Sequence, residues 1–416
     1  NNAIVENAVA GVATIEGNNY THTGGIIQAN KTTFRNCTQA VAFYAFENRH
    51  PTNGSVVNNN SNFGNCTFEI NNNYAGADTI RNIVSLDQIR GIKFVGCRFV
   101  NYCTSALATK PVGILSFNSS FLVYSLLNCN VYPCFDTIHS EFSKLGYGIR
   151  ALGAATTKTF KVDDAIFTEN KKNGVYASSL NYITLTRNRF YILRNDTNTM
   201  LKPFGGAYLD SCTGYIIEEN IFNKSGTGSQ SLKAVGLTIS NSGTFNNQVY
   251  KNTFNNLDIG ILAQRKNKNP ANKDGLCLRC NTFNACIYDI AVTKPTNGSN
   301  TQNGIALWQG SSTDPVGNLF TGNNPNLSYN FWNIDIDNSL IPDITYYHHS
   351  NFNIYPRLKP AFGKYTNLTP STTNKSFNPA SSCPSNLNGN PGIEEKLAYD
   401  FKADSLNQIL TQLVDD

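Results

Sequence analysis

Short apolar segments alternate with polar, turn-forming segments along most of the chain, and one pattern recurs where they meet. An asparagine stands two residues before a phenylalanine at successive spacings of 32, 32 and 29 residues. The four clean copies are Asn188 with Phe190, Asn220 with Phe222, Asn252 with Phe254, and Asn281 with Phe283. Such self-similarity indicates stacked copies of one structural unit rather than a conventional globular core.

The repeat extends towards the N-terminus through Phe34, Phe68, Phe99, Phe142 and Phe167. Val, Ile, Phe and Tyr suit short strands, whereas the abundant Asn and Gly tolerate the left-handed backbone of tight bends. Each unit is therefore predicted to run strand, turn, strand, loop, strand. The predicted fold class is all-β, a right-handed parallel β-helix with a short C-terminal helical segment. A β-sandwich would not hold aromatic residues in phase over such a length.

Three parts are expected along the chain. Residues 1–355 carry the repeat and are predicted to form the β-helix, and residues 356–392, rich in Pro, Asn, Ser and Thr, are predicted to be a loop or linker. Residues 393–416 have apolar positions at helical spacing and a capping box at Ser405. These helices either cap the last turn or begin a further helical region, and the second interpretation is favoured. The sequence is expected to be a mature or trimmed part of a longer protein.

The eleven cysteines follow the repeat in part, because Cys37, Cys66, Cys97 and Cys129 are spaced by 29, 31 and 32 residues. Equivalent positions of successive turns lie ~4.8 Å apart, so these cysteines are predicted to form one interior column. Buried free thiols are favoured, and disulfides between neighbouring turns are the alternative. A metal site at Cys277-x-x-Cys280 is disfavoured, since no second pair of ligands accompanies it.

Charged residues make up only 15 % of the chain and its net charge is +5, without a basic stripe. Nucleic acid is therefore not an expected partner. The cluster from Arg265 to Lys268 is interpreted as a solvated loop. The sequence has no apolar run long enough to cross a membrane as a helix, so no membrane span is expected.

Carboxylates are the first candidates for catalysis, because glycoside cleavage needs paired acids, or acids that hold Ca²⁺ beside a base. Two weak sets stand out: Asp163 and Asp164 with Lys161, and Asp210 with Glu218 and Glu219. Asp258 and Asp289 are expected near corresponding positions of successive turns. All of these carboxylates are expected mainly in solvent-exposed loops or turns. No cofactor is expected, and Ca²⁺ enters only if the chain is an enzyme.

Histidines and clustered aromatic residues offer weaker signals. His348 and His349 are adjacent, so their side chains should point to opposite faces of a strand and serve in packing or an aromatic surface rather than bind one metal. The aromatic residues Trp308, Trp332, Tyr346 and Tyr347 are expected to be core or cap residues, with stacking on sugars as the alternative.

The segment from Gly24 to Cys37, the Asn-x-Phe turns and the stretch from Gly317 to His349 resemble the large secreted β-helix proteins of Bacteroidetes, of the pectate-lyase-like superfamily. The resemblance implies cargo of the type IX secretion system, with a helical region and a sorting domain after the β-helix. It also implies O-glycosylation where an Asp precedes Ser or Thr and an apolar residue. Three triplets have this pattern, around Thr79, Thr137 and Ser405.

The strong scaffold without a convergent titratable cluster favours a non-catalytic protein, secreted or held on the outer cell surface. It would act as an adhesin, a spacer or a module that binds carbohydrate or a surface, and the type IX translocon would be its export partner. The alternative is a polysaccharide lyase or glycoside hydrolase acting on an acidic polysaccharide, with its site in the region 150–270. Carboxylates of neighbouring turns that converge in one groove would favour the enzyme.

Overall fold

The structure is a computed structural model of the 416-residue chain. It describes residues 2–14, 25–45, 48–49, 52–54, 56–104, 110–128, 136–154, 158–193, 204–226, 234–294, 303–321, 329–335, 344–350 and 368–387. The chain divides into two units, residues 1–376 and 377–416. The first unit contains the repeat.

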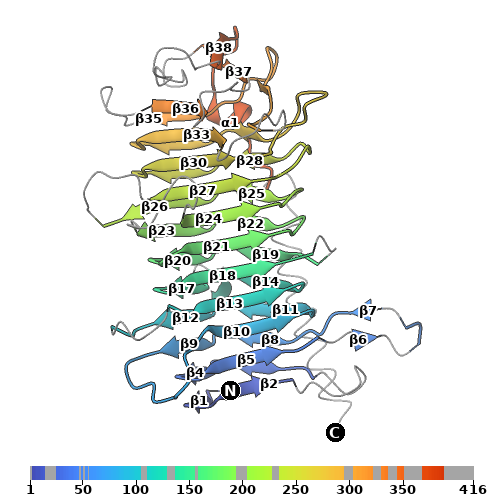
Figure 1. The fold of residues 1–416 in the computed structure, drawn as a ribbon, viewed down its shortest axis with the longest axis vertical. Coiled ribbons are helices and arrows are strands. Elements are labelled where there is room, and N and C mark those ends of the chain that lie inside the picture. The colour runs from blue at the N-terminus through green and yellow to red at the C-terminus, as the bar shows by residue number, and fades with distance from the viewer. Residues whose placement is uncertain are drawn as a thin grey trace. The chain divides into compact units, whose positions relative to one another are not determined.

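The described strands between Ile4 and Asp335 form a right-handed parallel β-helix, the predicted fold class, built from three long parallel sheets (Figure 1). Each of the first nine turns of the chain, called rungs here, contributes one strand to sheet A, then one to sheet B, then one to sheet C, and the last two rungs contribute strands to sheets A and B. Sheet A contains β1 (Ile4–Glu6), β4 (Thr33–Arg35), β9 (Thr67–Ile70), β12 (Arg98–Asn101), β17 (Glu141–Ser143), β20 (Ile166–Thr168), β23 (Arg189–Leu193), β26 (Ile221–Ser225), β29 (Thr253–Asn255), β32 (Thr282–Asn284) and β35 (Leu319–Thr321).

Sheet B contains β2 (Ala10–Ala13), β5 (Gln39–Phe43), β10 (Asn82–Asp87), β13 (Val112–Phe117), β18 (Tyr147–Leu152), β21 (Asn173–Ser178), β24 (Gly205–Asp210), β27 (Val235–Ser240), β30 (Ile259–Gln264), β33 (Tyr288–Lys294) and β36 (Tyr329–Asp335). Sheet C contains β3 (Gln28–Asn30), β8 (Asn62–Gly64), β11 (Arg90–Val95), β14 (Ser120–Tyr124), β19 (Phe160–Asp163), β22 (Thr184–Thr186), β25 (Ile216–Glu218), β28 (Gln248–Tyr250) and β31 (Cys277–Arg279). A strand too short to bury an apolar face alone is stabilised by the strands above and below it.

Small sheets interrupt the solenoid. Hairpins are formed by β6 (Asn48–Arg49) with β7 (Val56–Val57) and by β15 (Leu126–Asn128) with β16 (Asp136–Ile138). After the last rungs, β34 (Trp308–Gln309), β37 (Ile344–His348) and β38 (Leu368–Thr372) form a parallel sheet. The second unit contains the helix α1 (Pro379–Ser382), which is capped by the Asn378 side chain.

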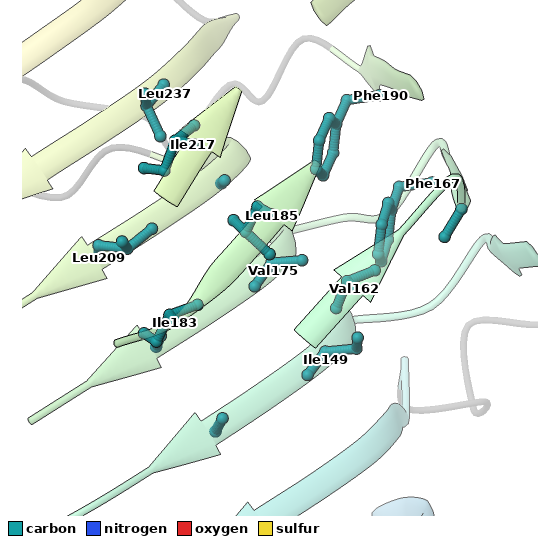
Figure 2. Packing of buried hydrophobic residues seen from close by; sticks show 14 of the residues in the cluster. Ile149, Val162, Phe167, Val175, Ile183, Leu185, Phe190, Leu209, Ile217 and Leu237 are labelled. Atoms are coloured by element: carbon teal, nitrogen blue, oxygen red, sulfur yellow. The ribbon is translucent and has the colours of Figure 1, made fainter. Parts of the chain in front are cut away.

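The repeated phenylalanines form a continuous stack inside sheet A. Neighbouring rings from Phe142 to Phe283 lie nearly parallel, with centroids 4.6–5.1 Å apart. Figure 2 shows Phe167 and Phe190 beside the aliphatic side chains of the other two sheets. The predicted phase of Phe190, Phe222, Phe254 and Phe283 is thereby confirmed, since each pairs with the next in register.

A column of glycines in sheet B faces this stack. A Cβ added at Gly174, Gly206 or Gly236 would lie 2.6–2.8 Å from the carbonyl oxygen of the next rung and 2.6–2.8 Å from a phenylalanine Cδ1. The phenylalanine rings therefore occupy the space that a side chain would need. The sequence repeat thus has two complementary parts: a phenylalanine in sheet A, and a glycine without a side chain opposite it in sheet B.

The bend from sheet C to sheet A holds the repeated asparagines, which are all buried. The residue before each one, such as Arg187, Glu219 or Lys251, has a positive φ of 54–58°. The asparagine amides then form a ladder along the axis. The Nδ2 of Asn188 donates to the Oδ1 of Asn220, and that of Asn220 donates to the Oδ1 of Asn252, each over 2.9 Å.

The single predicted cysteine column is wrong in part. Cys66 and Cys97 share the bend from sheet C to sheet A, but Cys37 lies at the bend from sheet A to sheet B, and Cys129 lies outside the described residues. The thiols of Cys66 and Cys97 contact each other and are free. Cysteines with similar spacing in the sequence therefore lie at different bends of the rung, because the loops within each rung vary in length.

The segments predicted to follow the β-helix are described only in part, and they contain two regular elements. The segment 356–392, predicted to be loop or linker, contains β38, which pairs with β37, and α1. The helical segment predicted for 393–416 lies outside the described residues. Among the described residues, no helix has the length and apolar character required to cross a membrane.

Candidate functional site

The first catalytic candidate, Asp163, is not exposed as expected but buried at the end of β19, with 4 % of its surface accessible. Arg187 of the next rung binds it through two bonds, Nε to Oδ1 over 2.9 Å and Nη2 to Oδ2 over 2.6 Å. The hydroxyl of Thr186 donates to Oδ1 over 2.8 Å, and the Nζ of Lys161 lies 3.7 Å from Oδ2. A carboxylate held in a bidentate ion pair is a structural anion rather than an available acid or base.

Asp164 occupies the left-handed position of the same bend, with φ 54°. Its Oδ2 lies 3.1 Å from the Nδ1 of His139, whose Nε2 lies 3.3 Å from an Nη1 of Arg189. His139 therefore links the bend at Asp164 to Arg189 at the start of β23.

The second set of candidates is not brought together. Asp210 ends β24 at the bend from sheet B to sheet C, where it accepts from the Nδ2 of Asn241 over 3.1 Å. Glu218 ends β25 at the other end of sheet C, and it is buried with 2 % of its surface accessible. The Oε1 of Glu219 lies 3.3 Å from the Nζ of Lys251. The expectation of an exposed site was wrong for Glu218.

Two further carboxylates also depart from the prediction. Asp258 directly precedes Ile259 and Asp289 directly follows Tyr288, and Ile259 pairs with Tyr288, so the two carboxylates lie on neighbouring rungs near corresponding positions but not at the same one. Both are buried rather than exposed. Asp258 accepts from the backbone N–H of Ala234, and Asp289 accepts from the Nδ2 of Asn330.

We expect Arg187→Met to lower the free energy of unfolding by about 3 kcal/mol, because it leaves the buried Asp163 carboxylate without its bidentate partner. Chemical denaturation followed by circular dichroism measures this change. Lys251→Met is the control, since its partly exposed pair with Glu219 is worth less than about 1 kcal/mol. Equal effects of the two changes would contradict a structural role for the Asp163 pair.

A different group of side chains gathers on the outer face of sheet B, called here the tyrosine face and defined by Tyr147, Arg150, Tyr176 and Tyr208. Arg150 pairs in register with Tyr176, and Tyr176 pairs with Tyr208, so the three follow one another on successive rungs. The ring centroids of Tyr147 and Tyr176 are 5.9 Å apart, and those of Tyr176 and Tyr208 are 5.3 Å apart. All four side chains are half-buried.

Charges surround this face. Arg150 and Lys172 lie 5.6 Å and 5.0 Å from the centre of the Tyr147 ring. Burial raises the pKa of Tyr147, Tyr176 and Tyr208, and Asp210 adds to the rise in the pKa of the last two. The hydroxyls therefore stay protonated at neutral pH and can both donate and accept.

Buried polar atoms on the same sheet lack protein partners. Among the described residues, no hydrogen bond is made by the Oδ1 of Asn173 or by the Nε of Arg150, although both atoms are buried. Asn173 pairs with Tyr147, so the two atoms lie on neighbouring strands of this face. A buried polar atom without a protein partner usually meets water or a ligand.

Sequence reasoning missed the tyrosine face. Its one signal was the 32-residue spacing of Tyr176 and Tyr208, which repeats the spacing of the Asn-x-Phe turns. Arg150 escaped notice because the turn between it and Tyr176 is shorter. When equivalent positions of successive rungs hold different residue types, as at Arg150 and Tyr176, the sequence shows no repeat at those positions.

The remaining candidates have clear places. Tyr346, His348 and His349 are buried, which confirms a packing role, and Trp332 stacks on Tyr288 with centroids 4.3 Å apart. Trp308 is exposed.

The predicted modification sites differ in their surroundings. Thr79 is exposed and Thr137 is half-buried in β16, whereas Ser405 lies outside the described residues.

Three or more His, Cys, Asp or Glu side chains placed to hold a metal do not occur in the part of the chain that the structure describes. Of the two cysteines in the Cys277-x-x-Cys280 pattern, Cys280 is in a disulfide and Cys277 is free. Comparisons with known proteins found no matching family model, no matching curated protein and no matching solved structure. The function must therefore be argued from the side chains themselves.

Proposed function

We propose that the protein is a non-catalytic β-helix that binds carbohydrate on its tyrosine face. The observation that carries the proposal is the row of half-buried tyrosines on a rigid sheet, with buried polar atoms beside them that lack protein partners. Aromatic faces pack against the apolar faces of sugar rings, while hydroxyl, amide and guanidinium groups bind their hydroxyls. A parallel solenoid holds these groups at fixed spacing without any loop having to order.

The carboxylates support the non-catalytic interpretation. Asp163 is neutralised by Arg187, and Asp210 and Glu218 stand at opposite ends of sheet C. Asp163 and Glu218 both pair with Thr186, so they stand two strand spacings apart, about 10 Å. Asp163 is already held by Arg187 through two bonds and Glu218 is buried, an arrangement that does not favour a catalytic pair of acids.

Export to the outside of a bacterial cell belongs to the same proposal. The resemblance to secreted pectate-lyase-like proteins of Bacteroidetes suggests an adhesin or surface module carried by the type IX secretion system. The disulfide at Cys280 is compatible with an oxidising compartment outside the cytosol.

The test is retention on a panel of polysaccharides. We expect Tyr176→Ala and Tyr208→Ala each to weaken binding about tenfold, as a lost aromatic contact of ~1.4 kcal/mol would. Tyr191→Ala is the matched control, because Tyr191 is a partly exposed tyrosine on the outer face of sheet A. Affinity is measured by depletion of the protein from solution at increasing amounts of polysaccharide.

The same panel distinguishes binding from cleavage. The proposal predicts no new reducing ends and no unsaturated products, with or without Ca²⁺. Products that disappear in Asp163→Asn would establish the enzyme alternative instead. Retention that is equal in the Tyr176→Ala, Tyr208→Ala and Tyr191→Ala variants would remove the tyrosine face as the binding site.

A further inference from the structure

A second group of apolar side chains is exposed where the bend from sheet B to sheet C leads into sheet C, with Tyr182 and Phe245 in the bend and Ile216 as the first residue of β25. Tyr182, Phe245 and Ile216 have 67 %, 63 % and 48 % of their surface accessible. They belong to successive rungs, since Thr184, Ile216 and Gln248 pair in register. Exposed apolar side chains that gather in one place mark an interaction site more often than isolated ones do.

The ring of Tyr182 lies against the backbone of the next rung. A Cβ at Gly214 would be 2.7 Å from both Cδ1 and Cε1 of Tyr182, so only a glycine leaves room for the ring. The N–H of Tyr182 donates to the carbonyl of Thr213 over 2.9 Å. The ring is thereby supported on one side while most of its surface remains exposed.

The side chain of Asn247 connects the loop of Phe245 to this bend. Its Oδ1 accepts from the N–H of Gly214 over 2.8 Å and from the hydroxyl of Thr213 over 3.1 Å. Its Nδ2 donates to the carbonyl of Ser242 over 3.3 Å. The segments that carry Tyr182, Ile216 and Phe245 are therefore held together by one hydrogen-bond network.

Backbone strain at Tyr182 points the same way. Tyr182 has a φ of 60°, and the equivalent residue of the next rung is Gly214, with a φ of 66°. A left-handed backbone is unfavourable for a residue with a large side chain, and the exposed ring gains little burial in return. The left-handed backbone itself is shared with the other bends of the solenoid, so what distinguishes Tyr182 is the large exposed ring at such a position.

One carboxylate borders this bend, because Asp210 directly precedes Ser211 and accepts from the Nδ2 of Asn241 over 3.1 Å. Residues 179–183, 211–215 and 241–247 themselves include no Asp, Glu, Lys, Arg or His, but several amides and hydroxyls. A charged residue is met in the following rung, where the carbonyl of Lys266 accepts from the N–H of Gly243. A ligand with apolar ring faces and uncharged hydroxyls fits such a surface.

We propose that Tyr182, Ile216 and Phe245, called here the corner platform, form a second binding site that stacks the pyranose rings of a neutral polysaccharide. The site is independent of the tyrosine face. It would let one molecule hold a polymer at two places.

The test uses particles of two uncharged polymers, cellulose and chitin, and measures depletion of the whole chain from solution. We expect Tyr182→Ala and Phe245→Ala each to weaken binding about tenfold. Tyr182→Phe keeps the ring and should retain binding within about twofold. Tyr191→Ala should bind like the unchanged protein, and thermal unfolding shows that each variant is folded.

The dependence of binding on salt distinguishes stacking on the corner platform from binding through the basic residues of the neighbouring rung. Stacking should persist when salt is raised to about 1 M, whereas charge-driven binding is screened. Loss of retention in salt, no retention on either polymer, or full retention by Tyr182→Ala would each overturn the proposal. The tyrosine-face variants Tyr176→Ala and Tyr208→Ala should keep platform binding, so failure of one site is distinguishable from failure of the other.

Discussion

Gly206→Ala is expected to lower the free energy of unfolding by about 3 kcal/mol, although it adds a single methyl group. The new Cβ would stand 2.6 Å from the carbonyl oxygen of Gly236 and 2.6 Å from the Cδ1 of Phe222. The carbonyl belongs to the strand ladder and the ring is fixed in the phenylalanine stack, so neither can move alone. Chemical denaturation monitored by circular dichroism gives the change.

Gly64→Ala is the matched control in β8, because the nearest atom to its added Cβ is the Oδ1 of Asn30 at 3.6 Å. We expect its effect to stay within about 0.5 kcal/mol. If Gly206→Ala were as mild as Gly64→Ala, the glycine column would be a feature of composition rather than a packing requirement.

The architecture was predictable because its two strongest constraints repeat in the sequence. A stacked phenylalanine must recur once per rung, and the asparagine two residues before it must bond to its equivalent on the next rung. Both requirements fall on single residue types, so the period can be read directly. The glycine column is as strict, and it too can be read from the sequence, where Gly148, Gly174 and Gly260 each follow a repeated phenylalanine by six or seven residues.

The candidate sites were less predictable because a site on a solenoid is assembled from different residue types on neighbouring rungs. Arg150, Tyr176 and Tyr208 follow one another across sheet B, but nothing in their sequence neighbourhoods is shared. Asp163 looked available because the sequence does not show that Arg187 stands directly beside it on the next rung. The spacing in the sequence shows which rung a residue belongs to. Its position within the rung depends on loop lengths, which vary from rung to rung.

This difference between scaffold and site bears on function. The interior columns are uniform over many rungs, so they provide rigidity and carry no specificity. Under the two proposals, specificity would come from outer positions that change from rung to rung, and the tyrosine face and the corner platform are two such positions. Such positions can differ without any change to the core.

Asn220→Ala should have an effect comparable to that of the glycine change, about 3–5 kcal/mol. The Oδ1 of Asn220 accepts from the backbone N–H and the Nδ2 of Asn188, and its Nδ2 donates to the carbonyl of Leu185 over 2.8 Å. Alanine removes the acceptor of the buried Asn188 N–H and one of the two acceptors of the Asn188 Nδ2, which keeps its bond to the carbonyl of Val162. The measurement is again the free energy of unfolding, compared with the unchanged protein at pH 7.

Asn223→Ala is the control, since Asn223 is a half-buried asparagine on the outer face of sheet A that accepts from the Nδ2 of Asn255 over 2.7 Å. Water can replace that bond, so we expect a loss below about 1 kcal/mol.

Asn220→Asp tests the same ladder through the pH dependence of stability, whose direction can be predicted. Its carboxylate would be buried beside carbonyl oxygens, which raises its pKa above the value in the unfolded chain. Stability should therefore be lowest at neutral pH and partly recover as the pH falls through the raised pKa. Equal losses in Asn220→Ala and Asn223→Ala, or no recovery in acid, would show that the ladder does not stabilise the bend as argued.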